Sequence, residues 1–217
     1  MMLPDLTLAA RRYGEIPYRC IRDAKSILDV GSSDGSMAKF SHYGPIFDRV
    51  NDAGNYLGLD IQEFEHTHYN IIKKDLRDFI AERKYDLVIA SHIIEHIEIE
   101  EWQSLFRKLF GCVTERGYLV VNVPFRQRKR ACICECAPMD HKVYGIDKKM
   151  LERFLPDGRY LYSIGKWRHF KENGEFFLYA VFRLFFRVLT FHPYSIFKGK
   201  GNVYQITGIW RKKRFEE

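Results

Sequence analysis

The sequence predicts an α/β protein whose parallel sheet is covered by helices on both faces. Short apolar runs of strand length alternate with helix-like segments, at residues 26–30, 56–61, 69–75, 85–90 and 118–124. Strands that are apolar almost throughout are typical of a sheet buried on both sides. The chain has 217 residues, of which 46% are hydrophobic, so it can bury one sizeable core and is expected to form a single domain.

The composition predicts the cellular location more clearly than it predicts a binding partner. The net charge of +7 allows an anionic partner without requiring one. Five cysteines are an odd number and form no secreted framework, which predicts a reducing, cytoplasmic location. The first ten residues lack the pattern of a signal peptide, and no run of about 18 uncharged apolar residues is present, so we expect no membrane-spanning helix.

The first strand leads into a glycine-rich turn, Gly31-Ser32-Ser33-Asp34-Gly35. Glycine lets the backbone bend sharply and lets another group approach closely. A helix-like stretch with Met37 and Phe40 as inward residues follows, and its first N–H groups can bind an anion or a polar ligand. A strand, a glycine turn and a helix in this order predict a ligand site, although an ordinary turn remains the alternative.

The second strand ends in an acidic residue, Asp60. A carboxylate at this position can accept both hydroxyls of a ribose, and the alternative is a cap or a solvated turn residue. Between the first two strands, Gly44-Pro45 is expected to end the first helix. After the third strand, a short helix is expected at 76–82.

The fourth strand runs into Ser91-His92-Ile93-Ile94-Glu95-His96-Ile97. This segment lies at the mouth of the sheet, where doubly wound folds bind their ligands. A helix is expected from Glu98. Its apolar face would be formed by Trp102, Leu105, Phe106, Leu109 and Val113.

The pieces ILDVGSSDG, YLGLDI, KKDLRDF, YDLVIASHIIEHI and GYLVVNVP resemble, in order and spacing, the cofactor half of a class I S-adenosylmethionine-dependent methyltransferase. The likeness is to the small bacterial, type 11-like members. It implies a Rossmann-like sheet of seven mostly parallel strands, with strands near 160–164 and 203–210 and the last one antiparallel. One departure is Ser33, where the family often has a second glycine, and a serine is small enough to be expected to fit.

The resemblance also implies the cofactor S-adenosyl-L-methionine and its contacts. Gly31, Ser33 and Gly35 would approach its methionine and ribose parts, and Asp60 would bind the ribose hydroxyls. Asp75 and Leu76 would lie near the adenine, and Ser91 would line the opposite side of the cofactor. The other expected cofactor contacts are Asp29, Ile61 and His92.

The same likeness divides the chain into a helical segment 1–24, broken at Pro17, a cofactor half 26–124 and an acceptor half 125–217. A helical insertion at about 165–202 is expected before the last strand. Its segment 174–191 is apolar nearly all round, which predicts burial, a homodimer contact or a contact with the inner membrane surface.

Two further patterns leave alternatives open. The basic run 126–130 is expected to be a solvated loop, and the alternative is a patch that binds RNA or phosphate. Cys132, Cys134 and Cys136 precede His141 and could bind zinc, but the spacing is not that of a usual zinc knuckle, so no metal ligand is assigned.

The function expected from the resemblance is methyl transfer to a small-molecule or glycan-like acceptor, at oxygen. His141 lies on the loop that borders the acceptor site in the family and is the expected base, because histidine can take a proton near neutral pH. Glu95 and His96 are expected on the acceptor side. An RNA methyltransferase and a non-catalytic cofactor-binding module are the alternatives.

Overall fold

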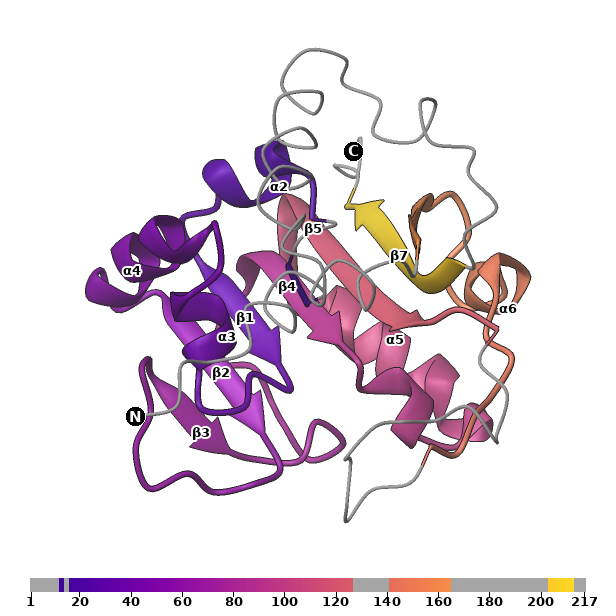
Figure 1. The fold of residues 1–217 in the computed structure, drawn as a ribbon, viewed down its shortest axis with the longest axis horizontal. Helices are drawn as coiled ribbons and strands as arrows, with labels where there is room; N and C mark the ends of the chain where they lie inside the picture. The colour runs from indigo at the N-terminus through magenta and orange to yellow at the C-terminus, as the bar shows by residue number, and fades with distance from the viewer. Residues whose placement is uncertain (1–11, 14–15, 127–140, 165–202, 213–217) are drawn as a thin grey trace, which may run out of the picture.

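The computed structural model describes residues 12–13, 16–126, 141–164 and 203–212 (Figure 1). Cys132, Cys134, Cys136, most of the basic run and the 174–191 helix lie outside the described residues, so the expectations that concern them stay predictions. No helix in the described parts of the chain has the length and apolar character needed to cross a membrane.

Seven strands form one sheet in the order β3-β2-β1-β4-β5-β7-β6 (Figure 1). The first five pair in parallel, and β7 pairs antiparallel with β5 and β6. The strands are β1 Ile27–Val30, β2 Tyr56–Asp60, β3 Ile71–Lys73, β4 Tyr85–Ser91, β5 Val113–Pro124, β6 Arg159–Ile164 and β7 Val203–Arg211. The expected seven-stranded, Rossmann-like fold is therefore confirmed, and the strand order reverses between β1 and β4.

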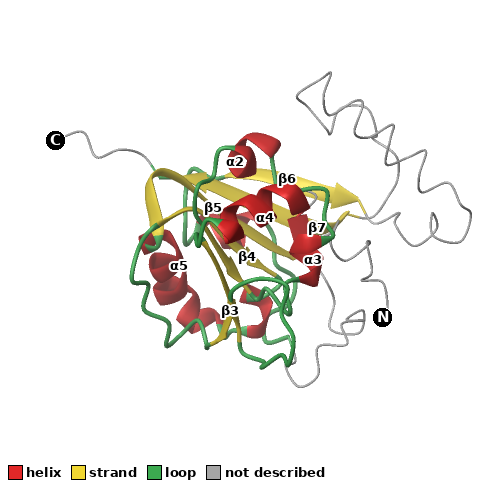
Figure 2. Ribbon diagram, turned by 90° about the vertical axis from the view of Figure 1, so that its left-hand side faces the viewer, coloured by secondary structure: helices red, strands yellow, loops and turns green. Residues whose placement is uncertain are grey.

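Helices cover both faces of this sheet (Figure 2). The helices α2, Tyr18–Arg22, and α4, Gly44–Asp52, lie on one face, where their apolar side chains join one buried cluster. The helices α5, Trp102–Gly111, and α6, Lys148–Glu152, contribute to the cluster on the other face. Successive residues of β4 alternate between the two clusters, as a strand with two covered faces requires.

Several local expectations were wrong, each for a physical reason. Gly44-Pro45 begins α4 rather than ending a helix. Proline has no backbone N–H, but the N–H groups of the first helical turn have no partner within the helix, so proline is tolerated there. The short helix α3, Ser36–Lys39, leaves Phe40 exposed rather than inward. Residues 76–78 form a turn and not a helix, since the Asp75 side chain accepts the backbone N–H of Arg77. Val113 belongs to β5 and not to the α5 face.

Candidate active site

The glycine turn after β1 adopts backbone conformations that explain its composition. Gly31 and Gly35 have φ values of 72° and 81°, in the left-handed region that favours glycine. The N–H of Gly31 donates to the carbonyl of Leu59, which holds the turn against the end of β2. A Cβ on Gly31 would lie 2.1 Å from the side chain of Ile93. The turn therefore packs closely against the segment that follows β4.

Ser33 also has a left-handed φ, 54°, at the position where the resemblance anticipates glycine. Its N–H donates to a carboxylate oxygen of Asp60 at 2.8 Å, and Gln62 donates to the other oxygen at 3.0 Å. Charge-assisted bonds of this kind offset the roughly 1–2 kcal/mol that a left-handed residue costs. Each oxygen keeps a further lone pair, so the half-buried Asp60 can still accept a hydroxyl.

The expected adenine side lies at the neighbouring edge of the sheet. Asp75 accepts from the guanidinium of Arg77 at 2.6 Å, and this bond lowers the pKa of the Asp75 carboxyl. Leu76 is buried, whereas Ile61 is exposed and offers an apolar surface. A carboxylate acceptor and an apolar side chain are groups that an adenine ring could contact, and the assignment of these residues to the nucleoside part of S-adenosylmethionine stays a prediction.

Asp29 lies beneath the glycine turn, and its burial argues against the expected contact with the cofactor. It is fully buried, and its oxygens accept from Arg12 at 2.5 Å, Tyr13 at 2.6 Å and Tyr56 at 3.1 Å. Burial alone would lower the pKa of the Arg12 guanidinium, but the Asp29 carboxylate outweighs it and raises that pKa. Burial raises the pKa values of both tyrosines, so they act as donors. Asp29 thus anchors the segment that precedes α2.

Arg12 ties the same segment to two strand ends. Its guanidinium donates to the carbonyls of Val30 at 2.8 Å and Ser91 at 3.1 Å. Its own carbonyl accepts from Asn122 at 2.6 Å, and Asn122 also donates to the hydroxyl of Ser91 at 3.2 Å. The Ser91 side chain is buried in this network, so a contact with the cofactor would involve its backbone.

His92 connects the end of β4 to β7. Its φ is 57°, and its two ring nitrogens lie 3.2 Å from Glu95 Oε1 and 3.3 Å from Gln205 Oε1. Strained conformations of this type cluster at functional sites. His92 is half-buried, follows the expected cofactor residue Ser91 and contacts the expected acceptor residue Glu95.

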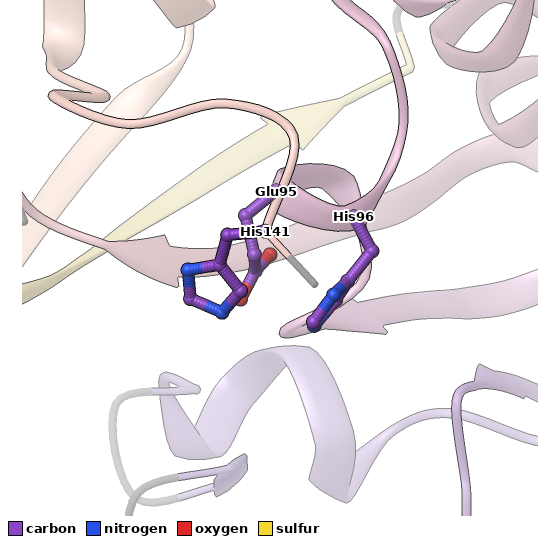
Figure 3. Close-up of side chains that lie close together, drawn as sticks. All are labelled: Glu95, His96 and His141. Carbon is purple, nitrogen blue, oxygen red and sulfur yellow. The ribbon is translucent and has the colours of Figure 1, made fainter. Parts of the chain in front are cut away.

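Glu95, His96 and His141 come together on the expected acceptor side (Figure 3). Glu95 and His96 belong to the short turn η1, Ile94–His96, and His141 precedes α6. The backbone carbonyl of Glu95 accepts the N–H groups of Lys142 at 2.7 Å and Val143 at 3.1 Å, which fixes the two segments side by side. The imidazole rings of His96 and His141 have centroids 4.7 Å apart. The structure thus unites the three residues that were expected on the acceptor side.

The sheet order, the antiparallel β7, the glycine turn and the acidic tip of β2 together define a class I S-adenosylmethionine-dependent methyltransferase. A family model described as a methyltransferase domain matches residues 7–179, so the chain belongs to this methyltransferase family, whose cofactor is S-adenosylmethionine.

Comparisons with individual proteins agree with this membership. A curated (S)-tetrahydroprotoberberine N-methyltransferase from Eschscholzia californica is 26% identical over 109 residues, which are 47% of this chain and 30% of that protein. The chain thus spans about a third of the length of the curated relative it matches.

Two solved structures share the fold over nearly the whole chain. A SAM-dependent methyltransferase from Archaeoglobus fulgidus has a TM-score of 0.59 at 18% identity, covering 95% of this chain and 93% of that one. The N-methyltransferase NodS from Bradyrhizobium japonicum WM9, in complex with S-adenosyl-L-homocysteine, has a TM-score of 0.56 at 9% identity, covering 98% and 91%. At these identities the likenesses establish the fold alone.

The sequence-based reasoning missed Arg12, Asn122, Gln205 and Thr207. Asn122 carried a signal, since it is the one polar side chain in the run Leu119–Val123. Gln205 and Thr207 are two residues apart in β7, so their side chains lie on the same face of the sheet. No local pattern distinguishes Arg12 from Arg11 beside it, because its role depends on partners 17 to 110 residues away.

Proposed function

We propose that this protein transfers a methyl group from S-adenosylmethionine to a hydroxyl oxygen of a small-molecule or glycan-like acceptor. The observation that supports the proposal is the buried Glu95 carboxylate beside His96 and His141, at the same sheet edge as the glycine turn and Asp60. One part of this edge suits a nucleoside, and the other can bind a hydroxyl and receive its proton.

Bound S-adenosylmethionine supplies a methyl group on an electrophilic sulfonium, so the protein mainly aligns the reactants and excludes water. Asp60 uses its remaining lone pairs for the ribose hydroxyls, and Gly31 and Gly35 let the backbone approach the ligand. The burial of Glu95 and His141 limits the access of water to the acceptor. If these three side chains act alone, His141 takes the proton of the acceptor hydroxyl, and Glu95 and His96 orient that hydroxyl.

A nitrogen acceptor is the second candidate. The likeness to the (S)-tetrahydroprotoberberine N-methyltransferase, 26% identical over 109 residues, favours it. A neutral amine carries a free lone pair, so it needs no base before it attacks the methyl group. The same acceptor cluster would then only orient the substrate.

The first prediction tests cofactor binding. Replacing Asp60 by Asn removes the charge that accepts the ribose hydroxyls, and it should weaken S-adenosylmethionine or S-adenosylhomocysteine binding by about 1–3 kcal/mol in titration calorimetry. Glu63→Gln is the matched control, since it removes an exposed carboxylate at the same end of β2 and should leave affinity unchanged. An intact protein that binds neither ligand would contradict the proposal.

The acceptor is identified by mass spectrometry after incubation with labelled cofactor and separate panels of hydroxyl compounds, amines and RNA. Labelled ethers support the oxygen proposal, and labelled amines support the second candidate. RNA labelling that falls steeply with salt would indicate the nucleic-acid alternative instead. Cofactor binding without methylation in any panel would indicate a binding module and overturn the proposed activity.

A further inference from the structure

The acceptor cluster contains the donor set of a metal site. Glu95, His96 and His141 can each offer one ligand atom, and these atoms lie within 4.8 Å of one another. Glu95 is fully buried and His141 is 8% exposed. Figure 3 shows the carboxylate of Glu95 close to the imidazole rings of His96 and His141. We propose that these three residues bind a divalent transition-metal ion of the zinc class.

A buried oxygen of Glu95 supports a cation at this point. Glu95 Oε2 has no hydrogen-bond partner within the part of the chain that the structure describes. Leaving a carboxylate oxygen buried without a partner is costly, and buried charges are normally paired or bound to metals. A cation beside Oε2 would supply the missing interaction, and the two imidazoles would complete its coordination.

The surrounding contacts hold the cluster in the arrangement that a metal needs. His92 contacts Glu95 Oε1 at 3.2 Å, which leaves Oε2 directed away from that bond, and Gln205 contacts the other His92 nitrogen. The Glu95 carbonyl binds the backbone of Lys142 and Val143, next to His141. Outer contacts that orient a ligating carboxylate are a regular part of metal sites and affect affinity 10–100-fold.

The donor types favour zinc over magnesium or calcium. Two imidazoles and one carboxylate form a known catalytic zinc set, whereas magnesium and calcium prefer oxygen ligands throughout. Zinc bonds of about 2.0–2.2 Å hold tetrahedral ligands roughly 3.4 Å apart. The three atoms lie within 4.8 Å of one another, so a bound ion would have to draw them closer by at most about 1.4 Å. Three protein ligands leave a fourth position open.

The role of the ion rests on the proposed function. The acceptor hydroxyl takes the open position, where the cation lowers its pKa and its proton leaves to solvent. The oxygen lone pair forms the new O–CH₃ bond as the S–CH₃ bond breaks. The sulfur keeps that electron pair and leaves as a neutral thioether. His141 then acts as a ligand rather than as the base.

The binding test uses the full chain, dialysed against EDTA and titrated with CoCl₂ as a spectroscopic probe for zinc. We expect one cobalt ion per chain, with visible bands of a low-coordinate site. Glu95→Gln, His96→Gln and His141→Gln should each weaken binding by about 100-fold or more, and His92→Gln by about 10–100-fold. His66→Gln, at an exposed histidine, is the matched control and should bind normally. Far-ultraviolet circular dichroism confirms that each variant folds.

A second variant separates this site from a cysteine site. Replacing Cys132, Cys134 and Cys136 together by Ser should preserve cobalt binding, and no thiolate charge-transfer band should appear in the near ultraviolet of the parent protein. Loss of binding in this triple variant, or normal binding by Glu95→Gln and His141→Gln, would overturn the proposal. So would the absence of cobalt binding by the parent protein.

The final experiment distinguishes the metal proposal from the proposed function. EDTA should leave S-adenosylmethionine affinity unchanged, abolish methyl transfer, and allow recovery of turnover with Zn²⁺ or Co²⁺. Full turnover in EDTA would overturn the role of the ion while leaving the methyltransferase proposal intact. Failure of cofactor binding would contradict the proposed function alone, because cobalt binding is measured without cofactor.

Discussion

At the scale of single residues, the site depends on carboxylates that already have protein partners. Asp60 accepts two backbone N–H groups, and Asp75 accepts from Arg77, before any ligand is considered. Both carboxylates therefore have fixed orientations. A ligand that meets an oriented carboxylate loses less conformational entropy on binding than one that must order it.

The Asp75–Arg77 pair predicts a pH dependence of stability. Bonds from Arg77 lower the pKa of Asp75 in the folded state below its unfolded value of about 3.9. The stabilisation is therefore present above that unfolded pKa and is lost as pH falls through the lowered folded pKa. Asp75→Asn should destabilise the protein at pH 6 but less so near pH 3, measured by urea unfolding. An equal destabilisation at both pH values would contradict this assignment.

Much of the candidate site could be predicted at this scale, because its residues lie in short local motifs. The sequence placed Glu95 and His96 after β4 and His141 after β5, and the structure brings them together. It did not predict that His92 holds Glu95, or that Glu95 Oε2 is buried without a hydrogen-bond partner in the described region. Those contacts depend on how side chains pack in the folded protein, which cannot be predicted from the spacing of residues in the sequence.

At the scale of elements, the turn after β1 and the segment after β4 are packed into a single unit. Ile93 occupies the space where a side chain on Gly31 would lie. Ile93 is two residues from Glu95, so the position of the acceptor cluster depends on the glycine of the cofactor turn. The glycine turn on the expected cofactor side and the segment that carries Glu95 on the expected acceptor side are therefore in direct packing contact.

Alanine substitutions can separate backbone strain from this contact. Gly54 also has a positive φ, 68°, but an added Cβ there meets nothing within 4 Å, so Gly54→Ala should cost only about 1–2 kcal/mol. Gly31→Ala carries the same strain plus a clash with Ile93, and it should cost a further 1–3 kcal/mol by denaturant unfolding, a range typical of about one excess methyl in a core.

The combination of Gly31→Ala with Ile93→Ala supplies the control. The smaller side chain at 93 should remove the clash but not the strain, so the double variant should show a favourable coupling energy. Equal costs for Gly31→Ala and Gly54→Ala, with no coupling, would show that the contact carries no energy.

At the scale of the whole molecule, the segment before α2 is joined to the centre of the sheet by a buried ion pair. Arg12 and Asp29 have side chains that are 6% and 0% exposed. Arg12 also contacts the carboxyl ends of β1 and β4. Arg12 thus lies against the strand ends near which the cofactor is expected.

Breaking this pair should destabilise the whole fold. Asp29→Asn leaves a buried guanidinium without its counter-charge, a change that costs about 3–5 kcal/mol in comparable sites, and thermal unfolding should show it. The double variant Arg12→Met with Asp29→Asn should be more stable than Asp29→Asn alone, because no buried charge remains. The exposed pair Arg22–Asp23 is the control, and Asp23→Asn should change stability by less than about 1 kcal/mol.

The parallel sheet covered on both faces was predictable from the apolar runs, which gave its first five strands, whereas the last two strands and the antiparallel pairing were implied by the family resemblance. The junction between the segment before α2 and the sheet was not predicted, since the family resemblance placed Asp29 among the cofactor contacts. Its burial follows from Tyr13 and Tyr56, which are brought to it by chain segments distant in sequence. Contacts of that kind become visible only in three dimensions.

Backbone hydrogen bonds hold the described residues on either side of the stretch 127–140. The N–H of Arg126 donates to Ile146, and Lys142 and Val143 donate to Glu95. His141 directly precedes Lys142 and Val143, so these main-chain bonds hold it next to Glu95. Because main-chain bonds do not depend on which side chains stand at 142 and 143, substitutions there can change the surroundings of the acceptor cluster without displacing its reactive groups.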